Sequence, residues 1–591
     1  MKTTSSRRDA PAQRVLIIGA DGADPTLLGR LMDAGQLPHL ARLREEGLSG
    51  ALQTTYPAVS PVAWTSLLTG CWPAKHGVLD FIIKAPGGYR PTLGLYEIIQ
   101  AGSTYRSRRS APTIAEMLSA RGRRSYLLHV PATFPAPAIR GGVLAGLGAP
   151  DLLGTFGVPA LYVSDRAALP ADIRERPEVE TLAAEPDGAW SGSLAGPAGE
   201  QLPFRLRRIG AGMALTLPQA EVGLATEIWS DWLPAQFGGA AGICRFCLLR
   251  ADDVIILYRT PLHHAPAAPG APLCWPADFA ARLAARLGPF ATASFPMEQA
   301  GYQNGLLPAG PFLAGAYAAW EQQARIAETL IAADDWALLV THLFTADALQ
   351  HFFWPDVEGV IAAGYRWLDG IVGRLRQRAG EHTAVLVVSD HGTAPVEQWL
   401  HLNRWLEQAG YLRRAAGGGV DWTATRAFCL GYGGVYLNVM GREPRGVIEP
   451  GRPYEQERAA LIAALRTLRD PHTGALLVQD ALPREAWHSG PHVRHAPDIG
   501  LMLRPGVGLA RADARGDAPA AGEILEPNRG RWRAGHEGPH APDAVAGVCL
   551  AAGPGLPRGR LDAARIVDIA PTVLRLLGET PPAGLDGQPF I

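Results

Sequence analysis

Six aspartate and histidine side chains have the types and spacing expected of metal ligands, and most of them directly follow an apolar run. They are Asp21, Asp347, His351, Asp390, His391 and His540. Carboxylate oxygen and imidazole nitrogen together suit zinc and other divalent cations. Three aspartates and three histidines suffice for two metal sites with about three protein ligands each, which leaves coordination positions open for a substrate and a nucleophile.

Ser60 supplies a hydroxyl group that could act as the nucleophile. It lies in TTYPAVSPVAWTSLLTG, a turn-rich loop that leads into a helix. Contact with a metal ion lowers the pKa of a bound hydroxyl, so a serine can attack as an alkoxide near neutral pH. Two metal ions about 4 Å apart can stabilise both oxygens of an in-line displacement at phosphorus. The set therefore predicts a two-metal phosphohydrolase.

Each of these residues also has an ordinary structural interpretation. An aspartate after a strand is commonly a helix N-cap. Asp347 and His351 are four residues apart on one helix face and could form an exposed pair. Asp390, His391 and Ser60 could belong to polar turns. Their joint occurrence at the ends of successive predicted strands favours the functional interpretation.

The elements that must position these residues alternate between strand and helix. Apolar runs predict strands at residues 14–19, 125–130, 336–341 and 384–389, and helical patterns follow them. This alternation predicts an α/β fold with a mostly parallel sheet covered by helices on both faces. Ligands of such sheets bind beyond the carboxyl ends of the strands, where the aspartates and histidines lie.

The domain organisation predicted from composition is a catalytic domain in two halves, residues 1–150 and 326–591, interrupted by an insertion at residues 151–325. The insertion is dense in Gly and Pro and shows no clear strand–helix rhythm, and we expect it to form a cap over the site. A second irregular region, at about residues 410–530, contains the strand-like segments GGVYLNVM and APDIGLML.

Composition limits the class of protein. The chain has 591 residues, 47% apolar and 19% charged, with a formal net charge of -1. These values indicate a globular protein without the basic excess of a nucleic-acid binder. No signal peptide precedes the first strand, and no apolar run is long enough to span a membrane, so a cytoplasmic protein is expected. Cys244 and Cys247 form the only C-x-x-C motif, for which a structural role is expected.

Taken in order, the motifs resemble the alkaline phosphatase superfamily and, within it, the type I phosphodiesterase/nucleotide pyrophosphatase family, including its predicted phosphohydrolase/phosphomutase group. The segments that carry the resemblance are LIIGADGAD, SPVAWTSLLTGCWPAKHGVLDF, TADALQHFFW, VVSDHGTAP, VYLNVMGREPRGVI and DIAPTVLRLLGETPPAGLDGQPF. The resemblance implies an alkaline-phosphatase-like core and a metal-dependent hydrolase that acts on a small-molecule phosphoester.

The resemblance also implies a role for each candidate residue. It implies one metal site of Asp21, Asp390 and His391 and a second site of Asp347, His351 and His540. Ser60 aligns with the family's Thr or Ser nucleophile, which would bridge the two metals and form a covalent phospho-enzyme. Zinc suits this mixture of ligands, and manganese is also possible.

Two positions need separate comment. The family's late histidine is usually followed by aspartate at the third position, as in His540-Ala-Pro-Asp543, so His540 is preferred over His536. Nucleotide pyrophosphatases typically carry asparagine three residues after the nucleophile, where this chain has Ala63. Oxyanion stabilisation is therefore expected from backbone N–H groups, the metals or another side chain.

Trp64, Thr65 and His129 are weaker candidates for contacts with the substrate, and each could instead only pack. A sulfatase is a rival because Cys71-Trp-Pro-Ala-Lys75 resembles the sulfatase C-x-P-x-R signature, with lysine in place of arginine. A phosphomutase and a non-catalytic binding protein are further alternatives. The substrate, the preference for monoesters or diesters and the oligomeric state are not readable from the sequence.

Overall fold

Strand β1 (Arg14–Ala20) is the first predicted strand, and its last six residues are all buried. The computed structural model describes residues 12–100, 104–295, 297–333, 335–517, 522–536 and 538–591. In it, β1 pairs in parallel with β22 (Leu338–Leu343) and with β23 (Thr383–Val388). Central strands of a parallel sheet are buried on both faces, which explains why these segments are continuous apolar runs without alternation.

The sheet continues beyond β23 in the order β22-β1-β23-β32-β2. Strand β32 (Gly547–Ala552) is antiparallel to both β23 and β2 (Leu48–Gln53). The short strands β33 (Gly559–Arg560) and β34 (Ala564–Arg565) pair in parallel with β2. The mostly parallel α/β sheet predicted from the sequence is thus confirmed. Because β22, β1 and β23 are parallel neighbours, the segments that follow them begin at the same edge.

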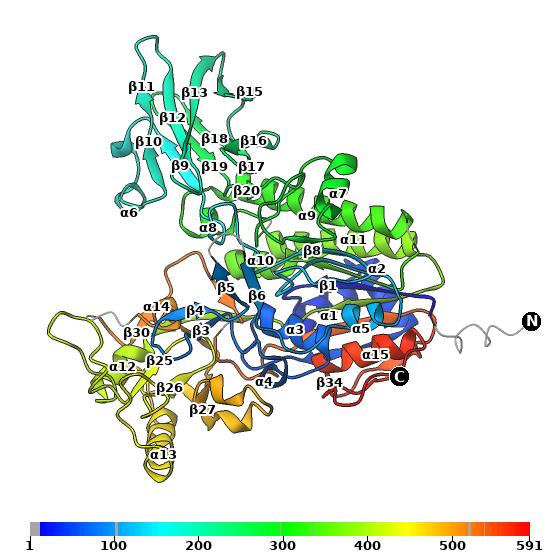
Figure 1. The fold of residues 1–591 in the computed structure, drawn as a ribbon, viewed down its shortest axis with the longest axis vertical. Coiled ribbons are helices and arrows are strands. Elements are labelled where there is room, and N and C mark those ends of the chain that lie inside the picture. Colours follow the sequence, from blue (N-terminus) through cyan, green and yellow to red (C-terminus); the bar gives the residue numbers. More distant parts are fainter. Residues whose placement is uncertain (1–11, 101–103, 296, 334, 518–521, 537) are drawn as a thin grey trace, which may run out of the picture. The chain divides into compact units, whose positions relative to one another are not determined.

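Two groups of helices pack on this sheet. The helices are α1 (Pro25–Asp33), α2 (Pro38–Glu46), α3 (Ser60–Thr69), α5 (Ile114–Ser119), α11 (Ala362–Ala379) and α15 (Ile569–Leu576). Helix α11 contacts β1, β23 and α2, while α15 and α5 contact α3. In Figure 1, α2 and α11 lie on the opposite side of β1 from α5 and α15. The helical pattern at residues 25–46 corresponds to α1 and α2, which are separated near Gly35.

The chain divides into two compact units. The first comprises residues 1–97, 106–125 and 335–591, and the second comprises residues 98–105 and 126–334. The insertion was predicted to start at residue 151. The second unit already includes all but the first residue of β7 (Ser125–Val130), so its main segment begins at residue 126. Its predicted role as a cap stays a prediction.

The first unit also contains smaller sheets formed by residues in the 394–535 region. Strand β24 (Ala394–Leu400) pairs with β29 (Gly506–Leu509), β30 (Leu525–Pro527) and β31 (Ala534–Gly535). A four-stranded sheet contains β25 (Ala427–Cys429), β26 (Val435–Leu437), β28 (Ile499–Leu503) and β27 (Val478–Pro483). Helices α12 (Leu402–Gln408) and α13 (Arg452–Arg466) share its apolar core. The strand-like segments noted in the sequence correspond to β26 and β28.

The second unit is rich in antiparallel strands, most of which were not predicted from the sequence. One sheet has the order β10 (Val179–Thr181), β9 (Ala160–Val163), β19 (Ile255–Arg259) and β18 (Phe246–Ala251), and a second has the order β11 (Ala183–Ala184), β12 (Trp190–Ala195), β13 (Gln201–Ile209), β14 (Gly212–Leu217) and β15 (Ala220–Leu224). A third has the order β16 (Leu233–Phe237), β17 (Ala240–Cys244) and β20 (His263–His264), and the longest helix of the unit is α9 (Ala309–Ala333). Buried and exposed residues alternate strictly along β16, as expected of a half-buried strand.

All six cysteines are free and buried. Burial raises the pKa of Cys244 and of Cys247 to about 12, so both are protonated thiols at neutral pH. This agrees with a structural role for the C-x-x-C motif. Within the described residues, no helix has the length and apolar character needed to cross a membrane.

Candidate active site

The residues that follow β1, β22 and β23 gather at one edge of the sheet. Asp21 directly follows β1, and Asp390 and His391 follow β23. Asp347 and His351 lie on α10 (Thr345–Phe353), the helix that follows β22. All five side chains are buried. The parallel pairing of three neighbouring strands therefore brings together residues that are up to 370 positions apart in the sequence.

Asp21, Asp390 and His391 form the first group of possible metal ligands, since one donor atom of each lies within 4.8 Å of the others. The Nε2 atom of His391 lies 3.2 Å from Oδ2 of Asp390 and 3.6 Å from Oδ1 of Asp21. The backbone N–H of Gly22 points to Oδ1 of Asp390 at 3.4 Å. This is the triad that the resemblance implied for one metal.

Ser60 is the first residue of α3, and its hydroxyl points into this first group. Its Oγ atom lies 3.0 Å from Nε2 of His391 and 3.4 Å from Oδ1 of Asp21. The N-terminus of a helix carries partial positive charge, which favours a bound anion. Ser60 is thus placed where an anionic group could meet both the helix terminus and the carboxylate–imidazole cluster.

A second group of donor atoms comprises Asp347, His391 and His536, again within 4.8 Å of one another. The Nε2 atom of His536 lies 3.3 Å from Oδ1 of Asp347, and that of His351 lies 3.0 Å from the same oxygen. The imidazole rings of His391 and His536 stack with their centroids 3.4 Å apart. The two groups are therefore contiguous and share His391.

The three imidazoles have the same orientation toward the cluster. Nδ1 of His391 contacts the carbonyl of Gly392 at 2.9 Å, and Nδ1 of His351 contacts the carbonyl of Ala534 at 2.6 Å. Nδ1 of His536 likewise contacts the Ala58 carbonyl at 2.6 Å. Because a carbonyl can only accept, Nδ1 of each ring must carry the hydrogen. Nε2 of each ring is then the atom that faces the carboxylates, the orientation typical of metal-bound histidine.

The electrostatics of the cluster also fit bound cations. Burial and the neighbouring negative charge of Asp21 raise the pKa of Asp390 well above its ordinary value. Burial acts in the same direction on Asp347, but the imidazoles of His351 and His536 hold its pKa well below the ordinary value. Burial and the adjacent His536 lower the pKa of His391 to about 4, so this ring is neutral at pH 7. The buried carboxylates of Asp21 and Asp390 repel each other unless a cation or a proton lies between them.

His540, preferred from the sequence as the last ligand, belongs to neither group of donor atoms among the described residues. It lines a small cavity together with Trp399 and Tyr432. His536 takes the expected place beside Asp347. The preference for His540 was based on its spacing to Asp543. In the structure, the ring of His536 is held beside Asp347 by the contact of its Nδ1 with the Ala58 carbonyl.

His342 is a buried residue at the site that sequence reasoning missed. It lies on β22, and its Nε2 contacts Oδ2 of Asp21 at 2.5 Å. Trp64 donates its Nε1–H to the same oxygen at 3.0 Å and packs edge-on against the His342 ring. Trp64 is fully buried, so it supports Asp21 from behind. The available signal was a polar residue at the carboxyl end of a buried strand, five positions before Asp347.

The other candidates lie elsewhere. Thr65 is buried on α3 and donates its hydroxyl to the Pro61 carbonyl at 2.6 Å, a contact within the helix. His129 belongs to the second unit, where it lines a cavity described below. Cys71 follows the C-cap of α3, so a helix of ten residues, about 15 Å long, separates it from Ser60. This separation disfavours the sulfatase alternative.

Comparison with known proteins identifies the family. The sequence model described as type I phosphodiesterase / nucleotide pyrophosphatase matches residues 15–182 and 292–538, more than half of the chain. No curated protein matches the sequence significantly.

Among solved structures, the chain is similar to phosphonoacetate hydrolase from Sinorhizobium meliloti 1021 in complex with phosphonoacetate. The identity is 14%, the alignment covers 97% of this chain and 98% of that chain, and the TM-score is 0.48. It is also similar to human ectonucleotide pyrophosphatase/phosphodiesterase 5, with 12% identity, 96% coverage of each chain and a TM-score of 0.46. The family match does not depend on these distant similarities. The chain belongs to the type I phosphodiesterase/nucleotide pyrophosphatase family and is a phosphoester hydrolase of that type.

Proposed function

We propose that this protein hydrolyses a small-molecule phosphoester, with Ser60 as the nucleophile at a centre of two divalent cations. The observation that carries the proposal is the common orientation of three buried imidazoles. Each donates Nδ1–H to a backbone carbonyl and turns Nε2 toward buried carboxylates around Ser60. Such an arrangement suits a bound cation, because imidazole Nε2 and carboxylate oxygen are both metal ligands and converge around one position.

The ligands divide into two sets of three. Asp21, Asp390 and His391 would hold one cation, and Asp347, His351 and His536 would hold the other. When bound, the cations would supply Lewis-acid stabilisation of charge on the phosphoryl oxygens and would lower the pKa of a hydroxyl in contact with them. The high share of imidazole favours zinc, and manganese is the second choice.

The protein residues position the reaction. Ser60 Oγ attacks phosphorus and the leaving group departs, which leaves the phosphoryl group on the serine; a water molecule then cleaves the phosphoserine bond. The N-terminus of α3 directs partial positive charge at the phosphoryl oxygens, a stabilisation that the side chain at Ala63 cannot supply. Its N–H groups contribute little, because Pro61 has none and those of Val62 and Ala63 donate to the Val59 carbonyl. His342 and Trp64 fix Oδ2 of Asp21, so that Oδ1 stays directed toward Ser60.

A panel of substrates tests the proposal. The metal-reconstituted protein is assayed on 4-nitrophenyl phosphate, bis(4-nitrophenyl) phosphate, a phosphonate monoester and 4-nitrophenyl sulfate. We expect turnover of a phosphoester that far exceeds turnover of the sulfate and that disappears when a chelator removes the metal. Phosphate released to solvent distinguishes a hydrolase from a phosphomutase, which would return the phosphoryl group to its substrate. A protein that binds two metal ions yet turns over no phosphoester would contradict the proposal.

A further inference from the structure

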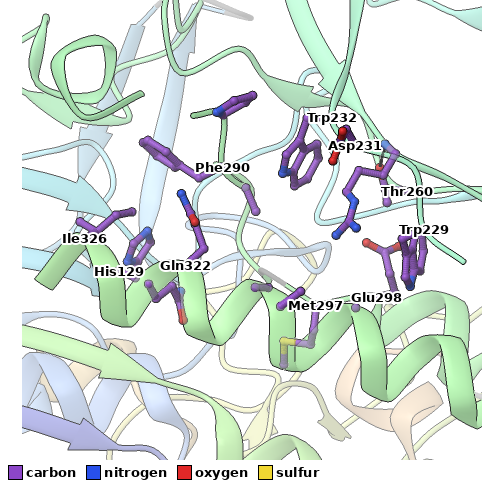
Figure 2. A pocket seen from close by; sticks show the side chains of 17 residues that line it. His129, Trp229, Asp231, Trp232, Thr260, Phe290, Met297, Glu298, Gln322 and Ile326 are labelled. Carbon is purple, nitrogen blue, oxygen red and sulfur yellow. Dashed lines mark hydrogen bonds between the residues drawn. The ribbon is translucent and has the colours of Figure 1, made fainter. Parts of the chain in front are cut away.

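The second unit contains a cavity of about 210 Å³ that runs along one face of helix α9 (Figure 2). The helix contributes residues at positions 315, 318, 319, 322, 323 and 326, whose spacing of three and four places them on a single face. Gly315, Ala318 and Ala319 are small and leave space above the helix. The lining spans twelve residues of helix, from position 315 to position 326, or about 16 Å, so the cavity suits an elongated ligand.

Arg245 supplies a cation at one end of the cavity. It lies between β17 and β18, and its guanidinium group lies over the rings of Trp229 and Trp232, 5.3 and 5.7 Å from their centroids. Its Nε–H donates to the Ser230 carbonyl at 2.8 Å. Within the described part of the chain, no carboxylate lies within ion-pair distance of the guanidinium nitrogens. The two terminal nitrogens therefore keep their paired N–H donors for a planar anion.

Gln323 supplies an unpaired amide in the middle of the cavity. Its side chain is only 3% exposed, and neither Oε1 nor Nε2 has a hydrogen-bond partner. A buried polar group without a partner is costly, so such groups in folded proteins commonly mark a place where a water molecule or a ligand binds. The neighbouring Gln322, by contrast, directs its Nε2 to the Leu287 carbonyl at 3.4 Å.

The rest of the lining is largely apolar. Figure 2 shows Phe290 and Ile326 at the end of the cavity away from Trp229. Asp231 and Glu298 lie near Arg245, and burial raises the pKa of Glu298 to about 7, so near neutral pH it carries only part of a negative charge. Nearby acidic groups disfavour a dianion such as phosphate more than a monoanion, so among anions a carboxylate fits this end of the cavity better than phosphate.

We propose that this cavity binds a small organic carboxylic acid. Its carboxylate pairs with the terminal nitrogens of Arg245, its apolar or aromatic body lies against Phe290 and Ile326, and a polar group of the ligand or a bridging water satisfies Gln323. The proposed ligands of the two cations do not line this cavity. The inference therefore does not depend on the proposed hydrolytic mechanism.

Isothermal titration calorimetry of the full chain tests the proposal with 3-phenylpropionate and hexanoate as probes. We expect saturable binding of at least one of them with one site per chain. The uncharged 3-phenylpropanol and the cationic 3-phenylpropylamine are expected to bind at least tenfold more weakly. Equal binding of the alcohol and the acid, or no binding of either acid, would overturn the proposal.

Two variants locate the binding site. Arg245→Met is expected to lower the affinity at least tenfold, whereas Arg207→Met, an exposed arginine on another strand of the same unit, leaves it unchanged. Gln323→Leu keeps the side-chain volume and is expected to weaken binding, because leucine offers no polar contact to the ligand or a bridging water. The same substitution is expected to raise the melting temperature of the ligand-free protein, because it removes an unpaired buried amide. Wild-type affinity in both folded variants, checked by circular dichroism, would place the acid elsewhere, including at the metal centre. If Arg245→Met does not fold, Gln323→Leu decides.

Discussion

His536 and His540 lie four residues apart, but only His536 has its Nε2 beside Asp347, at 3.3 Å. We therefore expect His536→Ala to lose about one bound metal ion per chain and to lower kcat/KM at least 10²-fold, since a metal ligand is removed. His540→Ala is the matched control and should keep both metal ions. Metal content by elemental mass spectrometry and hydrolysis of bis(4-nitrophenyl) phosphate check both variants. The reverse pattern would restore the assignment made from the spacing to Asp543.

A substitution at Trp64 tests whether its hydrogen bond to Asp21 orients that carboxylate. Trp64→Phe keeps an aromatic ring on α3 but removes the N–H that donates to Oδ2 at 3.0 Å. We expect metal affinity to fall about 10–100-fold, as is typical when a hydrogen bond to a metal ligand is lost. Trp320→Phe, a fully buried tryptophan of the other unit, is the control for a general loss of packing. Competition with a fluorescent chelator measures the affinity, and an unchanged value in Trp64→Phe would show that His342 alone orients Asp21.

At the residue scale, the sequence was informative where a side chain is held by its own strand or helix. Asp21, Asp390 and His391 lie close together because each comes within three residues of the end of one of two neighbouring parallel strands. The choice between His536 and His540 depended on a backbone carbonyl at Ala58, 478 positions away, which no local pattern encodes. His342 was missed because it lies near the end of β22. The apolar residues of that strand were enough to predict it, so its one histidine was not considered separately.

The packing of α3 against β1 positions Ser60 beside Asp21, and Gly19 makes that packing possible. A Cβ atom at Gly19 would lie 2.5 Å from Cη2 of Trp64, so α3 would have to move away from the strand. We expect Gly19→Ala to destabilise the fold by about 1–3 kcal/mol and to lower activity together with stability. Chemical denaturation followed by circular dichroism measures the change.

Gly29→Ala is the control for that substitution. Gly29 lies inside α1, and a Cβ atom added there would have no neighbouring atom within 4 Å. Alanine should stabilise this helix by about 0.5–1 kcal/mol, because glycine has the greater backbone freedom in the unfolded chain. If Gly19→Ala were as stable as Gly29→Ala, the position of Ser60 would not depend on the close packing of Trp64 in α3 against Gly19 in β1.

At the scale of elements, the four predicted strands each lie within two residues of an observed one, because buried parallel strands are short apolar runs between polar turns. Apart from β7, most strands of the second unit were missed although β16 alternates strictly between buried and exposed residues. Frequent Gly and Pro residues obscured this pattern, since they mark the tight turns between antiparallel strands as well as irregular loops. The division between the two units near residue 126 has no counterpart in the sequence pattern, because β7 is one continuous apolar run across it.

Three buried acids, distributed over both units, each contribute to the pH dependence of stability. Burial raises the pKa of Asp80, Glu298 and Asp513 to about 7 in each case. Between about pH 4 and pH 7, each of these carboxyl groups therefore binds more protons in the folded protein than in the unfolded chain. Their unfavourable effect is absent at low pH and grows as the pH rises through this window, so they make stability fall as the pH increases.

Glu298→Gln isolates one of these acids. The amide oxygen can still accept the hydrogen bond that Tyr258 donates to Glu298 at 2.6 Å, and the buried charge is removed. The pKa of Glu298 rises from 4.5 to about 7, so we expect the variant to match the wild type near pH 4 and to be more stable above pH 7, by on the order of 2–3 kcal/mol. Thermal unfolding of both proteins from pH 4 to pH 8 measures the difference. A constant difference across this range would show that Glu298 stays ionised in the folded protein.

We propose that Ser60 attacks phosphorus at a two-cation centre. The decisive measurement compares kcat/KM of the wild type with that of Ser60→Ala on two substrates, bis(4-nitrophenyl) phosphate and 4-nitrophenyl phosphate. Both proteins are reconstituted with zinc, and the metal content of each is measured in the same samples. We expect two metal ions per chain in both proteins. We also expect kcat/KM of Ser60→Ala to be at least about 10³-fold lower than that of the wild type, since the nucleophile is removed while its surroundings remain. Activity of Ser60→Ala within tenfold of the wild type, with both metal ions bound, would contradict it.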